Sequence, residues 1–269
     1  AAHLATLQTP DTDDRTVTIA LYDLTAAKRA ESLRADFVAN ASHELRTPLA
    51  SLMGFIETLQ GPAREDDAAR QRFLKVMAEQ AARMGRLIDD LLALSRIELH
   101  EHTPPRAKVD IDVILRRVSQ ELAYKAKGKD MDLVLEIPEV PPLIGDEDDL
   151  MRVFQNLVDN AIKYGFSDTP VVISVSPLIA GSAESRALGR PGMKVVVANQ
   201  GEGISRDHIP RLTERFYRVN TAKSRELGGT GLGLAIVKHI INRHKGVQKI
   251  ESSVGESTTV TCLLPLNEA

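Results

Sequence analysis

Residues 156–164 read Asn-Leu-Val-Asp-Asn-Ala-Ile-Lys-Tyr, and this stretch decides how the second half of the chain folds. Four polar side chains of the stretch would share one face of a helix, at i, i+4, i+7 and i+8: Asn156, Asn160, Lys163 and Tyr164. The opposite face is apolar and consists of Leu150, Phe154, Leu157 and Ala161. Such a helix is predicted to pack on a sheet by its apolar face. The polar face could be merely solvated, but asparagine is a poor helix former, which favours a ligand there.

Strands and helices alternate on both sides of this helix. The strands are expected at residues 109–111, 131–137, 171–175, 193–198, 249–252 and 258–264, and the helices from Asp112, across Asp148–Tyr164 and from Leu232. This order predicts a mixed sheet with helices on one face, which is an α/β sandwich. Residues 178–192 are rich in Gly, Ala and Ser and are interpreted as a loop insertion.

The composition is that of a globular protein with more than one domain. The chain has 269 residues, of which 43% are hydrophobic and 26% charged. A net charge of −3 gives no electrostatic case for a nucleic-acid partner. The single cysteine, Cys262, excludes an internal disulfide and fits a reducing cytoplasm. No apolar run approaches the roughly 20 residues needed to span a bilayer, so we expect membrane attachment only through an upstream segment.

The first hundred residues are predicted to contain a helical hairpin. Apolar residues recur at alternating steps of four and three, as in a heptad seam: Leu45, Leu49, Leu52, Ile56 and Leu59. After a break at residues 61–66, a second seam consists of Phe73, Met77, Met84, Leu87, Leu91 and Leu94. A lone hairpin would leave its apolar stripe in water, so we expect two chains to form a four-helix bundle.

The domain boundaries follow from a strand pattern and a linker. Residues 16–22 alternate as in a strand, and one strand cannot bury a core. The segment Thr-Pro-Pro at residues 103–105 marks a linker. We therefore predict three parts: the tail of a truncated upstream domain at 1–25, the hairpin at 26–102 and the sandwich at 103–269.

The predicted hairpin carries the run His-Glu-Leu-Arg-Thr-Pro at residues 43–48. With the leucine seam facing inward, His43 and Thr47 lie one turn apart on the outer face of the helix. A single surface histidine is usually inert. The complete run, however, resembles the phosphoacceptor box of sensor histidine kinases, which implies that His43 accepts a phosphoryl group.

The residue types of this run fit phosphoryl transfer. Neutral imidazole is a nucleophile near pH 7, because its reference pKa is about 6.5. Attack through one ring nitrogen makes the other acidic, and the adjacent Glu44 could take that proton and orient the ring. The resemblance implies that Thr47 positions water in the reverse, phosphatase direction. Pro48 crowds a carbonyl and removes a donor, so we interpret it as a hinge or as a tolerated irregularity.

The stretch at residues 156–164 resembles the asparagine box of the ATPase superfamily shared by histidine kinases, Hsp90, gyrase and MutL. The resemblance implies that Asn160 binds Mg²⁺ through its amide oxygen, a suitable hard donor. It also implies that Asn156 supports the metal and phosphates, that Lys163 contacts phosphate and that Tyr164 borders the adenine. Members that hydrolyse ATP carry a glutamate at the position of Asn156, where an amide cannot activate water.

A second box follows the strand expected at residues 193–198. The run Asn199-Gln-Gly201-Glu-Gly203 resembles the first glycine box of this superfamily, in which a leading aspartate accepts a hydrogen bond from the adenine amino group. This chain has Asn199 there, whose amide oxygen can still accept. Because a charge-assisted bond becomes a neutral one, at a loss of about 1 kcal/mol, we predict weakened ATP affinity and not abolished binding.

Two further motifs complete the implied nucleotide site. The run from Arg215 to Arg218 resembles the phenylalanine motif, with Arg218 as the γ-phosphate contact. The next glycine loop opens a helix and contains Gly228, Gly229, Thr230, Gly231, Leu232 and Gly233. Its backbone amides would face phosphate. The loop lacks the preceding strand of a Rossmann fingerprint, and the chain has no Walker loop. Residues 205–230 are interpreted as a mobile lid.

The resemblance covers residues 26–269, and the nearest subgroup is that of PhoR-like sensor kinases. The PAS domain of these kinases ends with an Asp-Leu/Ile-Thr turn, and residues 1–25, which end in Asp-Leu-Thr, resemble such a tail. It implies ATP and Mg²⁺, a homodimer held by the hairpin, and a response-regulator receiver domain as partner. The expected location is cytoplasmic, in a bacterial sensor that an upstream segment could anchor in the inner membrane.

Three alternatives to a sensor kinase with full activity stay open. The first is a pseudokinase scaffold in which Asn199 has crippled ATP use. The second is an ATP-driven clamp like MutL or Hsp90, against which Asn156 and the run at His43 both argue. The third keeps the fold but makes phosphatase activity dominant.

Overall fold

The computed structural model describes residues 2–8, 15–21, 23–100 and 103–266. The chain divides into two compact units, residues 1–73 and 74–269. Of the helices in the described ranges, none combines the length and the apolar character that crossing a bilayer requires.

The first unit opens with two strands, β1 (Ala2–Gln8) and β2 (Arg15–Leu21), which pair antiparallel. The sequence analysis predicted only one strand in this part of the chain, at residues 16–22, and that prediction was wrong because β1 precedes it. The β1 stretch contains only one β-branched residue, Thr6, and therefore has a weak strand pattern. Tyr22, the last residue of the predicted strand, lies outside the described residues.

Helix α1 (Thr25–Gln60) follows the hairpin of strands. The carboxylate of Asp23 accepts a hydrogen bond from the backbone amide of Thr25 at 2.9 Å, which satisfies one free donor at the start of the helix. Hydrogen bonds from the side chain and the backbone of Thr25 lower the pKa of Asp23. The helix continues through Pro48, so this proline does not end it.

The predicted seam of α1 divides into two stripes. Leu45, Leu52 and Leu59 recur every seven residues and are half-buried. Leu49 and Ile56, which were expected to face inward with them, are 48% and 41% exposed in the single chain. One neighbouring helix cannot cover every apolar position of α1, so part of the stripe stays in water in a lone hairpin, as the sequence analysis expected. The placement of Leu49 and Ile56 inside a bundle of two chains stays a prediction.

Helix α2 (Asp67–His100) completes the helical hairpin that the sequence predicted. Asp66 accepts a hydrogen bond from the backbone amide of Ala69 at 2.8 Å and thereby caps its first turn. Within the first unit, the rings of Phe55 and Phe73 stack with their centroids 5.2 Å apart. This aromatic pair fixes the two helices to each other beside their connecting turn.

The second unit contains the remainder of α2 and an α/β sandwich. Its elements in chain order are β3 (Ala107–Val109), α3 (Ile111–Lys127), β4 (Leu133–Glu136), β5 (Leu143–Gly145), α4 (Glu147–Tyr164), β6 (Val171–Pro177), α5 (Ala183–Leu188), β7 (Gly192–Gln200), η1 (Ile209–Arg211), α6 (Thr221–Glu226), α7 (Gly233–Arg243), β8 (Val247–Ser253) and β9 (Ser257–Pro265). The main sheet has the order β4-β6-β7-β9-β8, in which only β4 and β6 are parallel. Strands β3 and β5 form a small separate pair.

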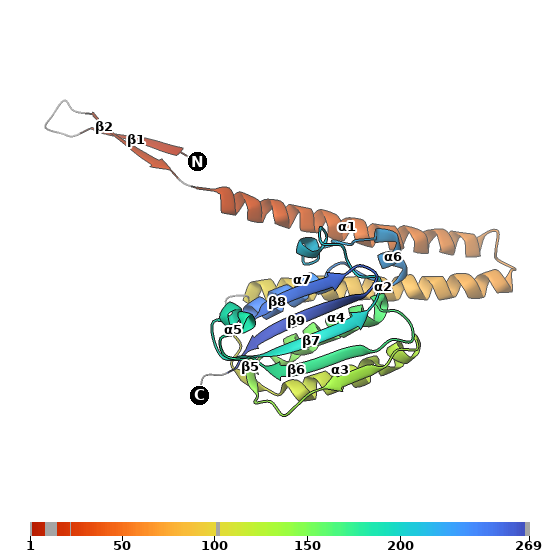
Figure 1. Ribbon diagram of the computed structural model, residues 1–269. Helices are drawn as coiled ribbons and strands as arrows, with labels where there is room; N and C mark the ends of the chain where they lie inside the picture. Colours follow the sequence, from red (N-terminus) through yellow and green to blue (C-terminus); the bar gives the residue numbers. More distant parts are fainter. Residues whose placement is uncertain (1, 9–14, 22, 101–102, 267–269) are drawn as a thin grey trace. The chain divides into compact units, whose positions relative to one another are not determined.

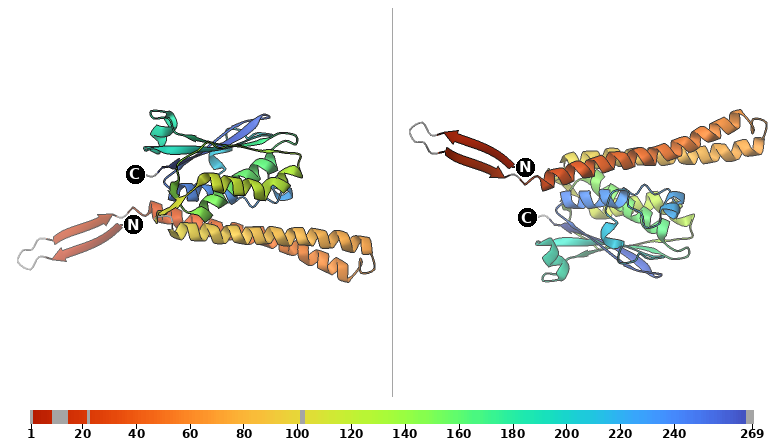
Figure 2. Two further views of the ribbon diagram at one scale, coloured as in Figure 1. Left: turned by 90° about the horizontal axis from the view of Figure 1, so that it is seen from below. Right: turned by 90° about the horizontal axis from the view of Figure 1, so that it is seen from above.

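Helices α3, α4 and α7 cover one face of the main sheet, as Figures 1 and 2 show. Helix α4 lies between the other two and presents its apolar face to β6 and β7. Leu150, Phe154, Leu157 and Ala161 are all buried there, as the sequence predicted. Burial of one such leucine or phenylalanine contributes about 1.5–3 kcal/mol, so this face holds α4 on the sheet.

Two aspartates set where the first long helices of the sandwich begin. Asp110 accepts from the backbone amide of Asp112 at 3.1 Å, and Asp146 accepts from that of Asp149 at 3.2 Å. The cap at Asp110 places the start of α3 at Ile111, so the predicted strand at 109–111 lies too far along the chain. A side chain that accepts from the helix backbone competes with strand pairing at this point.

The predicted loop at residues 178–192 contains a short helix instead. Ser182 caps α5 by accepting from the backbone amide of Ser185 at 3.0 Å. Gly189 ends the helix with a φ of 72°, a conformation that glycine adopts without strain. Six residues are too few to show helical periodicity, so the sequence analysis missed this helix. Ser182 and Gly189, as a typical start and a typical end of a helix, were the available signal.

Candidate nucleotide-binding site

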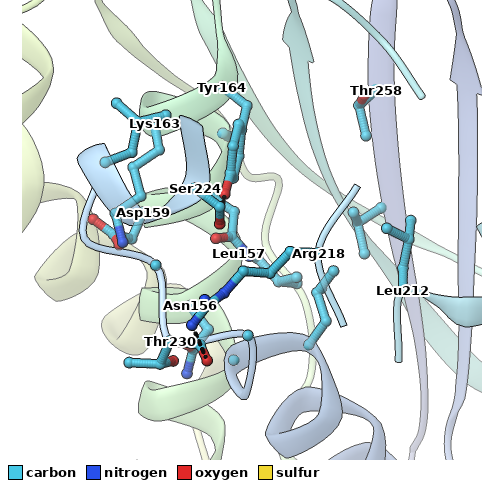
Figure 3. Close-up of a pocket in the computed structure, with 18 of the residues that line it drawn as sticks. Asn156, Leu157, Asp159, Lys163, Tyr164, Leu212, Arg218, Ser224, Thr230 and Thr258 are labelled. Carbon is cyan, nitrogen blue, oxygen red and sulfur yellow. Dashed lines mark hydrogen bonds and ion pairs between the residues drawn. The ribbon is translucent and has the colours of Figure 1, made fainter. Parts of the chain in front are cut away.

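A cavity of about 630 Å³ lies in the second unit, between the polar face of α4 and the segments that follow β7. Figure 3 shows Asn156, Asp159 and Lys163 along α4, with Leu212 and Thr258 on the opposite side of the space. Most of the predicted nucleotide residues line it: Asn156, Asn160, Lys163, Tyr164, Asn199, Gly203, Arg218, Gly229, Thr230, Gly231 and Gly233. Gly201, Arg215 and Leu232 are described but lie outside its lining.

The polar face of α4 carries a charge network. Asp159 pairs with Lys163 at 2.7 Å and also with Lys125 of α3. Burial by itself would raise the pKa of Asp159, but the two ammonium groups outweigh it and hold the pKa below its usual range. Asp159 therefore stays ionised and holds the ammonium of Lys163 at the wall of the cavity.

Asn156 meets the start of helix α7. Its amide nitrogen donates to the carbonyl oxygen of Arg152 at 2.9 Å, which turns its Oδ1 the other way. A Cβ on Gly233 would come within 2.5 Å of that oxygen, so any larger residue there would displace the side chain of Asn156. The first turn of α7 has no side-chain cap, and its unpaired amides suit an anion such as phosphate.

The glycine loop before α7 is held by an arginine and an aspartate. Gly228 and Gly231 have positive φ values of 68° and 76°. Arg218 donates to the carbonyl oxygen of Thr230 at 2.8 Å, and the hydroxyl of Thr230 donates to Asp90 of α2 at 2.7 Å. Burial raises the pKa of Asp90, against the opposing effect of the hydrogen bond from Thr230.

The other end of the cavity is more apolar and suits a flat base. Its lining there includes Val197, Ile204, Leu212, Ile250 and Val260. Asn199 is buried at the end of β7, and its Nδ2 donates to the carbonyl oxygen of Gln200 at 3.1 Å. This bond commits the nitrogen to the backbone, so the amide oxygen is the group that can accept from an amino group.

The phenylalanine-motif arginines take different partners. Arg218 lines the cavity, whereas Arg215 forms an ion pair with Glu98 of α2. Tyr164 hydrogen-bonds Ser224 of α6 through its hydroxyl at 3.0 Å (Figure 3). The segment at residues 205–230, which the sequence analysis interpreted as a lid, contains two short helices, η1 and α6. Helix α6 contacts the end of α4 through this hydrogen bond.

His43, Glu44 and Thr47 lie on α1, in the first unit, and none of them lines the cavity. His43 and Thr47 are exposed, and Glu44 is partly buried. The hydroxyl of Thr47 donates to the carbonyl oxygen of His43 at 3.2 Å, one turn earlier in the helix. The imidazole of His43 is thus exposed to solvent.

Sequence reasoning missed several residues that line the cavity. Arg86, Asp89 and Asp90 come from α2, and no local pattern marks them as neighbours of the glycine loop. Asp159, by contrast, lies four residues before Lys163, and the i,i+4 rule for opposite charges on a helix could have identified this pair.

The donor set favours a metal that is held mainly by phosphate. Among the described residues, no cluster of three or more His, Cys, Asp or Glu side chains could hold a metal ion by itself. Asn160 presents an amide to the cavity one turn from Asn156. Mg²⁺ commonly binds through one or two protein oxygens together with phosphate oxygens, and this arrangement fits that pattern.

Comparison with known families matches both halves of the chain. The His Kinase A (phospho-acceptor) domain matches residues 33–100, and the histidine kinase-, DNA gyrase B- and HSP90-like ATPase family matches residues 145–268. The phosphate regulon sensor protein PhoR of Pseudomonas aeruginosa is 38% identical over 240 residues, which cover 89% of this chain and 52% of that protein. The chain spans between 38% and 63% of the length of the curated relatives that it matches.

Solved structures share the fold. The Acinetobacter baumannii histidine kinase AdeS has a TM-score of 0.64 at 22% identity, covering 84% of this chain and 98% of that one. Histidine kinase ThkA, solved in complex with response regulator protein TrrA, has a TM-score of 0.66 at 17% identity, covering 99% of this chain and 75% of that one.

Proposed function

Because this chain belongs to the sensor histidine kinases of two-component systems, we propose that it transfers the γ-phosphoryl group of ATP to His43 and then to an aspartate of a response regulator. The observation that carries the proposal is the cavity that joins the asparagine face of α4 to the glycine loop before α7. The cavity has a charged, amide-rich end for phosphates and an apolar end for a base.

In the proposed complex, the base lies at the apolar end and the amide oxygen of Asn199 accepts from the adenine amino group. The triphosphate lies beside Lys163, Arg218 and the first turn of α7, where cationic groups and free amides stabilise its charge. Mg²⁺, held by Asn160 and the phosphates, would neutralise charge that develops on the transferred group.

In the transfer step, one ring nitrogen of His43 forms a bond to the γ-phosphorus while the bond between that phosphorus and the bridging oxygen of ADP breaks. The proton on the other ring nitrogen passes to Glu44, which follows His43 in α1. Asn156 stands where a hydrolytic relative carries glutamate, so water is not activated by a base at this position. The phosphoryl group is thereby reserved for the imidazole.

The partner in the second step is proposed to be a receiver domain that docks on the helical hairpin of a homodimer. The match to the phosphoacceptor family and the fold likeness to ThkA, which was solved with a response regulator, support this proposal. Thr47 is proposed to position water in the reverse, phosphatase reaction. Use of ATP and the single buried Cys262 support a cytoplasmic location for this part of the protein.

The test is incubation of the purified chain with Mg²⁺ and ATP labelled at the γ-phosphorus. We expect acid-labile, base-stable label on the unmodified chain and none on His43→Ala. Thr47→Ala is the matched control on the same helix face, because it should keep the label and lose only the phosphatase reaction. A chain that releases phosphate steadily without becoming labelled would instead be an ATP-driven clamp.

A further inference from the structure

The ammonium group of Lys129 contacts three backbone carbonyl oxygens at the end of helix α4. Its Nζ donates to the carbonyl oxygens of Ile162 and Lys163 at 2.9 Å each, and to that of Gly165 at 2.8 Å. Lys129 lies in the turn between α3 and β4, more than thirty residues before these acceptors. No sequence pattern pointed to it, and it does not line the cavity.

These contacts satisfy acceptors that the helix itself cannot satisfy. The last four carbonyls of a helix lack intrahelical donors, and here the backbone amide of Gly165 supplies one, to Ala161. The ammonium of Lys129 has three N–H groups and three carbonyl acceptors within reach. Its positive charge is also favourable at the negative end of the helix dipole.

The end of α4 that Lys129 binds is a wall of the nucleotide cavity. Lys163 and Tyr164 line the cavity from this last turn. Gly165 then pairs with Gly201, and the backbone amide of Phe166 donates to the carbonyl oxygen of Gln200 at 2.9 Å. A Cβ on Gly201 would come within 2.5 Å of the carbonyl oxygen of Tyr164, so the two segments are in close contact.

We propose that Lys129 is a positioning residue for nucleotide binding, because its ammonium holds the end of α4 against the segment that carries Asn199. The inference rests on the proposed nucleotide site and adds to it a residue that touches neither base nor phosphate. Without the ammonium, two carbonyls at the helix end lose their donor, and the last turn is free to unwind. Lys163, Tyr164 and Asn199 would then no longer hold their relative positions.

The electrostatic surroundings support a coupling between Lys129 and the segment over the cavity. Burial lowers the pKa of Lys129, the nearby Lys223 of α6 lowers it further, and Glu202 opposes both effects. Lys223 and Glu202 themselves form an ion pair at 2.5 Å. Tyr164 is bonded to Ser224 in the same short helix. The charge of Lys129 therefore acts where α4, α6 and the end of β7 meet.

The test compares Lys129→Met, which keeps the length and bulk of the side chain, with Lys127→Met, which removes an exposed ammonium two residues earlier. Affinity for Mg²⁺–ADP is measured by titration calorimetry on the full chain, at a temperature where all variants are folded by circular dichroism. We expect the dissociation constant to rise about tenfold or more for Lys129→Met and to stay unchanged for Lys127→Met. Lys129→Arg should recover part of the loss, because it restores a cation with several donors.

Two further measurements separate positioning from general stability. Amide hydrogen exchange at Gly165 and Phe166 should become faster in Lys129→Met, because the amide of Gly165 closes the last turn of α4 on Ala161 and that of Phe166 joins the helix end to Gln200 of β7. In the labelling assay, the KM for ATP should rise while the rate at saturating ATP stays close to that of the unmodified chain. If Lys129→Met does not fold, Lys129→Gln, which removes the charge but keeps an amide donor, is expected to show the same loss of affinity.

A lower melting temperature with an unchanged dissociation constant and unchanged exchange would overturn the inference and leave the proposed function intact. Failure of the unmodified chain to bind Mg²⁺–ADP would overturn both.

Discussion

At the scale of single residues, two amide side chains in the cavity are each oriented by one hydrogen bond to the backbone. Asn156 gives its amide nitrogen to a carbonyl oxygen one turn earlier, and Asn199 gives its nitrogen to the next carbonyl along the chain. In both residues the oxygen is left as the acceptor for other groups. An amide that is oriented in this way can recognise an amino group or a cation without a rearrangement.

Asn199 is the residue at which a single substitution should strengthen binding. In Asn199→Asp, the proposed acceptor for the adenine amino group becomes charged, and charge-assisted bonds are stronger by about 1 kcal/mol. We expect the dissociation constant for ATP to fall about fivefold in calorimetric titration. GTP, which has an oxygen in place of the amino group, should gain nothing. An equal or weaker affinity for ATP would show that Asn199 does not read the base.

His244 predicts how stability depends on pH. This buried imidazole accepts from the backbone amide of Asp146 at 3.0 Å, and its Nδ1 lies 2.8 Å from the carbonyl oxygen of Ile240. Burial lowers its pKa, and the charges of Asp149 and Arg243 act in opposite directions on it. A depressed folded-state pKa means that the unfolded chain binds more protons, so stability is full above about pH 6.5 and falls below it.

The measurement is urea unfolding of the chain and of His244→Gln at pH 7.5 and pH 5.5. The unmodified chain should lose more stability between these values than the variant, which has no group that titrates at this position. At pH 7.5 the variant itself should be less stable by about 1–3 kcal/mol, because buried hydrogen bonds are lost. Equal losses on acidification would contradict the assignment to His244.

At the scale of elements, the cavity is made where the polar face of α4 meets the uncapped start of α7. The close approach of these two helices depends on Gly233, at the first position of α7. Since the space that a side chain would need is taken by Asn156, the backbone amides of α7 can face the same volume as the amides of α4. The start of α7 and the polar face of α4 thus line one cavity, and their amides suit an anion there.

Gly233→Ala tests this arrangement. The new methyl group would overlap Asn156 Oδ1, and relieving such overpacking costs about 1–3 kcal/mol. We expect ATP affinity to fall about tenfold or more in the same titration. Gly85→Ala in α2 is the matched control, since a Cβ there meets no atom within 4 Å. That change should leave affinity unchanged and slightly increase helix stability. Similar effects of the two changes would contradict a special role for Gly233.

At the scale of the whole molecule, the helical hairpin has more apolar surface than one chain covers. Leu49, Met53 and Ile56 are 48%, 56% and 41% exposed and form one stripe along α1. The stripe begins six residues after the exposed His43. Association of two hairpins would bury it and give a bundle in which each His43 remains on the outside.

Leu49→Glu combined with Ile56→Glu should convert the proposed dimer into a monomer. Two charges buried at the centre of a bundle cost far more than the exposed interface can offset. The measurement is mass by light scattering during size-exclusion chromatography. Ile179→Glu, at a more exposed apolar site of the second unit, should leave the mass unchanged. A double variant that keeps the mass of two chains would place the dimer interface elsewhere.

Some features of the fold and of the site could be predicted because they depend on the spacing of residue types along a short stretch of the chain. The apolar face of α4, the leucine seam of α1 and the glycine loop before α7 repeat at intervals that a helix or a turn imposes. The roles of Asn156, Asn160 and His43 followed from their places in such runs and from a family resemblance, and they stay predictions. The strand β1 and the helix α5 were missed, since each is too short or too weakly patterned to stand out.

By itself, the sequence determined the long helices and the main strands, which of their faces are apolar and which runs resemble nucleotide and phosphoacceptor boxes, because spacing along the chain sets these properties. Only the tertiary structure decided that Asp90 of α2 contacts Thr230, that Arg215 pairs with Glu98 and that Lys129 holds the end of α4. These contacts join residues far apart in the chain, and those of Lys129 use backbone carbonyls that every residue has. Such contacts leave no pattern in a sequence, because they exist only once the chain has packed.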